Sequence, residues 1–94
     1  MKNDAMFVVD LMLENADALK NNDFETVNRN CFFIMNFHLD TFRWLCLFGQ
    51  FYYTATQYNR IFNHHDICFA FRYVKWKLRH VCDEFVDITP PCIE

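Results

Sequence analysis

Basic and aromatic side chains recur along the segment 66–88, and side chains of these types could bind a ligand. When residues are placed about 100° apart, as in a helix, two strips of side chains flank an apolar stripe. The basic strip holds Arg72, Lys75 and Arg79. The aromatic strip holds Phe69, Tyr73, Trp76 and His80.

Aromatic rings beside cations suit the binding of a nucleotide or nucleic acid, and they are also usual anchors of protein interfaces. The pattern favours a protein partner, with nucleotide or nucleic-acid binding as the alternative. A third interpretation is that the aromatic strip packs on another helix of the same domain.

Histidine and cysteine residues lie close together in the sequence at two places, which raises the question of a metal site. His64 and Cys68 are four residues apart and would share a helical face, and His65 lies three residues before Cys68. His80 and Cys82 are two residues apart, so on a helix they point in different directions. No Cys-x-x-Cys pair occurs. A zinc-stabilised module is therefore only a second alternative, and we expect no cofactor.

The residues needed for several kinds of catalysis are missing from the chain. It contains no serine, and its one glycine does not allow a glycine-rich loop around a phosphate. Asp83 and Glu84 are adjacent, so on a helix their carboxylates point apart. We therefore expect that the protein is not an enzyme.

Helical spacing is clearest in the segment that carries the basic and aromatic strips. Asp66 is a good N-cap residue, and the prolines after Thr89 end the predicted helix 66–88. Its apolar residues follow steps of three and four: Ile67, Phe71, Val74, Leu78, Val81 and Phe85. The segment 4–20 is also predicted to be a helix, capped by Asn3 or Asp4. Its two neighbouring apolar stripes, the first of which begins at Met6, indicate contacts on two sides.

The middle of the chain allows two interpretations. The segments 23–38 and 40–63 fit helices, the first begun by a capping box of Asn22 and Glu25 and the second capped by Asp40. The same region is rich in residues that prefer strands, and its one glycine could mark a break. We predict an all-α bundle of three to four helices that forms a single domain over residues 1–94. The alternative is an α+β fold with a short hairpin around residues 42–58.

Composition narrows the class of protein further. The 94 residues are 53% hydrophobic and 19% aromatic, which excludes a disordered or collagen-like chain. The net charge is −3, yet residues 41–82 hold six basic residues and one acidic residue. No apolar run is long enough to span a membrane. Five cysteines without an export signal indicate a reducing, cytoplasmic environment in which Cys31 and Cys46 pack as apolar residues.

Eighteen aromatic residues are a large apolar load for a domain of this size. A small domain leaves much of its surface in water, so an aromatic surface needs a cover. We therefore expect a homo-oligomer, a complex with another protein, or both. The predicted function is that of a small intracellular interaction protein that binds, and thereby inhibits or scaffolds, another protein. In general composition the chain resembles small viral or phage factors that act on host machinery, a resemblance that covers no motif.

Overall fold

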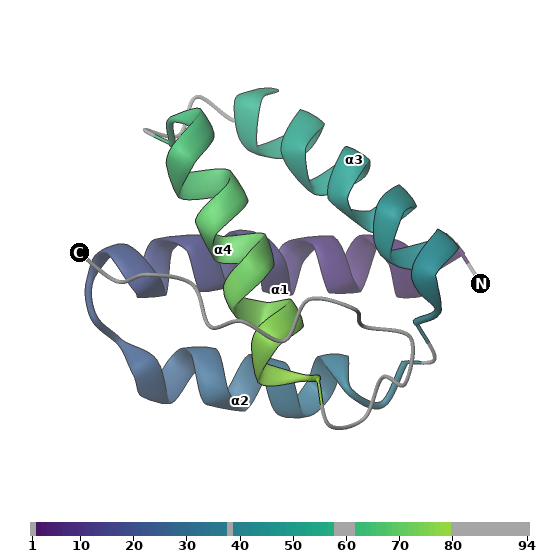
Figure 1. The fold of residues 1–94 in the computed structure, drawn as a ribbon, viewed down its shortest axis with the longest axis horizontal. Coiled ribbons are helices and arrows are strands. Elements are labelled where there is room, and N and C mark those ends of the chain that lie inside the picture. The colour runs from purple at the N-terminus through teal and green to yellow at the C-terminus, as the bar shows by residue number, and fades with distance from the viewer. Residues whose placement is uncertain (1, 38, 58–61, 80–94) are drawn as a thin grey trace.

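The computed structural model describes residues 2–37, 39–57 and 62–79, and these residues form four helices (Figure 1). The helices are α1 (Lys2–Lys20), α2 (Phe24–Ile34), α3 (Thr41–Gln57) and α4 (His64–Lys77). The predicted all-α bundle is therefore confirmed. The alternative of a hairpin around residues 42–58 is wrong, because 42–57 lie within α3, and the described residues contain no strand.

α1 is the central helix, and each of the other three packs against it. Its buried side chains cover more than half of its circumference and are Val8, Val9, Met12, Leu13, Asn15, Ala16 and Ala18. This width confirms the prediction of neighbours on two sides. Two details of that prediction are wrong: Met6 is exposed rather than part of the core, and Asn3 and Asp4 lie inside the helix instead of capping it.

The start of α2 is fixed by Asp23 and not by the predicted pair of Asn22 and Glu25. The Asp23 carboxylate accepts hydrogen bonds from the Thr26 amide at 3.2 Å and from the Thr26 hydroxyl at 2.6 Å. These two bonds lower the pKa of Asp23. Asn22 has a φ of 55°, in the left-handed region that asparagine tolerates better than most residues, so it turns the chain between α1 and α2.

α3 forms despite its strand-preferring residues because one of its faces belongs to the core. Trp44, Leu47, Phe51 and Ala55 recur every three or four residues, and all four are buried. Asp40 caps the helix as predicted, since its carboxylate accepts from the Arg43 amide at 2.8 Å. Tertiary burial thus outweighs the local strand preference.

α4 begins earlier than predicted and also ends earlier. Asn63 is its N-cap, and its side chain accepts from the Asp66 amide at 2.8 Å while the Asp66 carboxylate accepts from the Asn63 amide at 3.3 Å. Asp66 is therefore the third residue of the helix and not its cap. The helix ends at Lys77, with Leu78 as its C-cap, so the prediction of one continuous helix over 66–88 is wrong. Residues 80–88 lie outside the described part of the chain.

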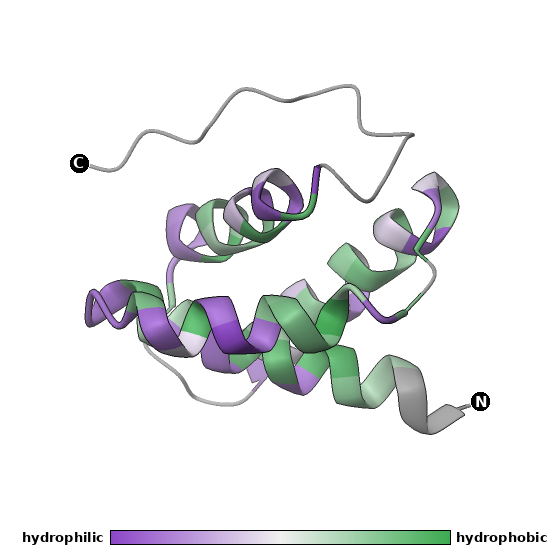
Figure 2. Cartoon of the chain, turned by 90° about the horizontal axis from the view of Figure 1, so that it is seen from below, coloured by the Kyte–Doolittle hydropathy of each residue, from purple (hydrophilic) through white to green (hydrophobic). Residues whose placement is uncertain are grey.

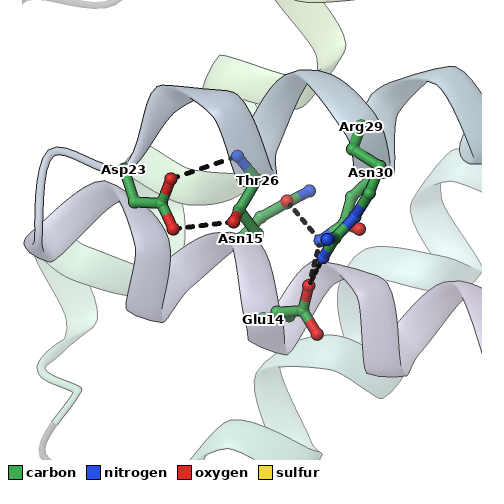
Figure 3. A network of polar contacts seen from close by, with 6 residues as sticks. All are labelled: Glu14, Asn15, Asp23, Thr26, Arg29 and Asn30. Carbon is green, nitrogen blue, oxygen red and sulfur yellow. Dashed lines mark hydrogen bonds and ion pairs between the residues drawn. The ribbon is translucent and has the colours of Figure 1, made fainter.

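Two asparagines are buried where α1 meets α2 (Figure 3). The Asn30 side-chain amide donates to the Asn15 Oδ1 at 3.1 Å and to a Glu14 carboxylate oxygen at 2.9 Å. Arg29 donates to the same Glu14 oxygen at 2.7 Å. This network links a buried amide pair to an ion pair at the surface, which fixes how α2 is placed along α1.

Candidate functional site

The predicted aromatic strip of α4 runs from the surface into the contact with α2. Tyr73 is only 6% exposed. Its ring centroid lies 6.4 Å from that of Phe24 on α2, 6.0 Å from Phe69 and 5.7 Å from Trp76. Burial raises the pKa of the Tyr73 hydroxyl. Phe69 and Trp76 are half-buried. Tyr73 thus packs within the domain, while the other two rings keep part of their surface open.

The basic strip of α4 remains at the surface, and one of its members contacts the aromatic strip. The Arg79 guanidinium lies 4.5 Å from the centroid of the Trp76 ring and donates to the Trp76 carbonyl oxygen at 2.7 Å. The Lys77 ammonium lies 6.0 Å from the same ring. Arg72 is exposed and Lys75 is half-buried. His80, the seventh predicted site residue, lies outside the described residues.

A second surface, on the side of α3 away from the core, was not predicted from the sequence. Phe42, Leu45 and Tyr53 are 72%, 67% and 66% exposed. Cys46 and Gly49 are also exposed and lie between them along the helix. At 100° per residue these five positions fall on one side, opposite the buried residues of α3. We call Phe42, Leu45, Cys46, Gly49 and Tyr53 the outer face of α3.

The outer face of α3 has no charged residue, which is unusual for the solvent side of a surface helix. Arg43 is the one charged residue in the 17 residues of this helix. Nothing lies within 4 Å of the place where a Cβ atom of Gly49 would be, so the face has an open notch at its middle. The spacing of Phe42, Leu45, Gly49 and Tyr53 is a sequence signal that could have revealed this face.

More apolar side chains are exposed at one end of the bundle. The first turns of α1, the last turn of α2 and the first turn of α3 all lie at the right of Figure 1. The exposed residues there include Met6, Phe7, Phe32, Phe33 and Met35. The hydropathy colours of α1 and α2 become greener toward the same end in Figure 2. The outer face of α3 therefore begins beside other exposed apolar groups.

His64 and Cys68 come together because α4 begins at His64. The Cys68 sulfur lies 3.4 Å from His64 Nε2, and the Tyr52 hydroxyl of α3 lies 2.8 Å from His64 Nδ1. The His65 ring instead stacks near Phe69, with 6.2 Å between centroids. Within residues 2–37, 39–57 and 62–79, no three His, Cys, Asp or Glu side chains gather as they would around a metal ion. The predicted pair of His80 and Cys82 lies outside these ranges.

The described thiols differ in their surroundings. Cys31 is buried, as expected, and loss of solvation raises its pKa to about 11 although the nearby charge of Lys77 acts in the opposite direction. Cys46 is exposed, so the prediction that it packs in the core is wrong. Cys46 lies on the solvent side of α3, and the opposite side of this helix packs in the core. These two thiols and Cys68 are all free.

Comparison of the chain with protein-family models, curated proteins and solved structures finds no match. Among the helices of the described residues, none has both the length and the apolar character that crossing a lipid bilayer requires. The arrangement that remains for function is a helical bundle with two open surfaces, the outer face of α3 and the partly open basic and aromatic strips of α4.

Proposed function

We propose that this protein is a non-enzymatic interaction protein that binds another protein chain, which it inhibits or scaffolds. The observation that carries the proposal is the outer face of α3, where Phe42, Leu45 and Tyr53 are each about two-thirds exposed or more. A large aromatic side chain has roughly 150–250 Å² of surface and leucine has less, so these three residues together expose at most roughly 400 Å² on one helix. This area is within the range of the largest apolar patch on a typical monomer, roughly 300–600 Å², and such patches are often functional.

The strips of α4 supply a second, more polar contact in this proposal. Trp76 and Arg79 are the residue types that most often anchor protein interfaces. Their mutual contact places a flat guanidinium on a ring, which gives a partner a preformed surface at little entropic cost. A nucleotide is less well supported as the partner, because Tyr73 is buried and the Arg79 guanidinium already covers part of the Trp76 ring.

The variant that tests the proposal is Leu45→Glu, which places a charge within the outer face of α3. Asn28→Glu, at an exposed position of α2, adds the same charge away from this face. We expect the wild-type chain and Asn28→Glu to retain the same partner in pull-downs from native extract, and Leu45→Glu to lose it. Circular dichroism should show equal helical signals for all three proteins. Equal partner retention by Leu45→Glu would overturn the proposal.

Salt dependence separates the two classes of partner. Binding driven by phosphate charges weakens steeply as salt concentration rises, whereas burial of an apolar face does not. We expect partner retention to change little between low and moderate salt. A steep loss, together with recovery of nucleic acid in the bound fraction, would favour the nucleotide or nucleic-acid alternative instead.

A further inference from the structure

We propose that the chain covering the outer face of α3 is a second copy of this protein, with the two α3 helices antiparallel and a twofold axis passing at Gly49. This inference rests on the proposed function and names its partner. It follows from the charge, the shape and the area of the face.

The distribution of charge on α3 favours antiparallel packing of this helix against α3 of a second copy. The outer face has no charged side chain that a partner would have to neutralise, so burying this face leaves no unpaired charge. The N-terminus of any helix has a partial positive charge and its C-terminus a partial negative charge. Antiparallel packing of two copies brings opposite ends together, whereas parallel packing would bring like ends together.

The shape of the face is self-complementary about Gly49. The space above this residue lets a second helix approach closely, because no side chain lies there. With the axis at Gly49, residues four positions before it oppose residues four positions after it in the other copy. Leu45 of each copy then packs on Tyr53 of the other, and both side chains are open in the single chain. The two large exposed groups thus cover each other on either side of the notch.

The area suits a weak and reversible dimer. Phe42, Leu45 and Tyr53 from two copies provide at most roughly 800 Å² of apolar surface. This is less than the roughly 1,200 Å² at the lower end of stable specific interfaces. The dimer should therefore dissociate on dilution. The small net charge of −3 adds little repulsion between the copies.

Disulfide trapping tests the arrangement of the two helices. Gly49→Cys, in a chain with Cys46, Cys68, Cys82 and Cys92 changed to alanine, places two thiols at the proposed axis. The comparison chain keeps Cys46 and Gly49, and its Cys68, Cys82 and Cys92 are likewise changed to alanine. In the proposed dimer the two Cys46 residues lie about 9 Å apart along the helices, beyond the roughly 7 Å that a disulfide allows. We expect mild oxidation to give a linked dimer for Gly49→Cys and not for the Cys46 chain.

Sedimentation of the unmodified protein provides the second measurement, since a new side chain at Gly49 could itself disturb packing. We expect the wild-type chain and Asn28→Glu to change with concentration from 11.5 kDa monomers to dimers of twice that mass. Leu45→Glu should need at least tenfold higher concentration for the same dimer fraction.

Three outcomes would overturn the inference. A Cys46-linked dimer would mean parallel packing. A wild-type monomer at all concentrations that still loses an extract partner through Leu45→Glu would mean a different protein on this face, and would leave the proposed function standing. A monomer that retains its extract partner in spite of Leu45→Glu would remove both proposals.

Discussion

The Asn30 amide donates to Asn15 Oδ1 at 3.1 Å across the contact between α1 and α2, and both side chains are fully buried. Two polar groups in a core of apolar residues are stable only as a pair. Without Asn30, Asn15 would keep its desolvation cost and lose this hydrogen bond, whereas Asn30 without Asn15 would keep its bond to Glu14. The pair therefore adds specificity to the placement of α2 on α1.

Changing one member of this pair should be more harmful than changing both. We expect Asn30→Leu to lower the free energy of unfolding by about 1–3 kcal/mol, because the Asn15 side chain stays buried without its donor. The double variant Asn15→Leu with Asn30→Leu should be closer to wild type than the single variant. Urea unfolding followed by circular dichroism measures both. Strictly additive losses would contradict the proposed coupling.

The helices that could be predicted from the sequence were those whose core stripes are unambiguous. Ile67, Phe71 and Val74 predicted the inner side of α4, and all three are buried. The cap of α3 at Asp40 was predicted, but the cap of α4 was not, because neighbouring polar residues compete there. Either Asn63 or Asp66 can cap a helix, and their reciprocal hydrogen bonds decide between them only in three dimensions.

The candidate site was predicted less well than the fold. Spacing alone placed Tyr73 on an open strip, yet α2 covers it through Phe24. A helical wheel shows which residues share a side, but it does not show which sides meet another helix. For the same reason the outer face of α3 was missed: the sequence does not show that α3 packs on the core with its other side and leaves Leu45 and Tyr53 exposed.

The buried thiol of Cys31 should make stability depend on pH in the alkaline range. Its pKa is about 11 in the folded chain, against 9.0 for an ordinary cysteine. Between these values the unfolded chain releases a proton that the folded chain keeps, so the stabilising contribution is complete below pH 9 and is lost as pH rises toward 11. A shift of this size corresponds to at most about 2–3 kcal/mol.

Two measurements test this prediction. The free energy of unfolding should fall more steeply between pH 9 and 11 for the wild-type chain than for Cys31→Ala. Burial and the charge of Cys31 both raise the pKa of Tyr73, so the comparison is made with Tyr73→Phe in both chains, which removes the tyrosine ionisation. Near pH 8 a thiol reagent should modify the exposed Cys46 well before Cys31. Equal labelling rates, or parallel pH profiles, would show that Cys31 is accessible to water.

Trp76 and Arg79 allow a test of whether the strips of α4 serve binding or folding. The stacked pair lies at the edge of the core, and a contact of this kind contributes about 0.5–1 kcal/mol at exposed sites. We therefore expect Trp76→Ala with Arg79→Ala to keep the helical signal and to lose affinity for the partner. Arg29→Ala, at an exposed position of α2 outside both surfaces, is the control for lost charge. Collapse of the fold in the double variant would assign both side chains to the core instead.

Substitution of Gly49 should change the stability of the single chain and the strength of its association in opposite directions. In the middle of a helix, glycine is less stable than alanine by about 0.5–1 kcal/mol, because it loses more backbone freedom on folding. A Cβ atom at this position meets nothing in the folded chain. We expect Gly49→Ala to raise the free energy of unfolding by this amount when it is measured at a concentration where the chain is monomeric.

The same substitution should weaken the dimer, because the new methyl groups from both copies meet at the twofold axis and push the α3 helices apart. Asn28→Ala, a change to the same residue at an exposed position of α2 away from this face, should leave association nearly unchanged. Thermal unfolding and sedimentation of the two variants measure the opposite effects separately. If Gly49→Ala stabilised the monomer and dimerised as strongly as wild type, the close approach of two α3 helices would not be the reason for glycine at this position.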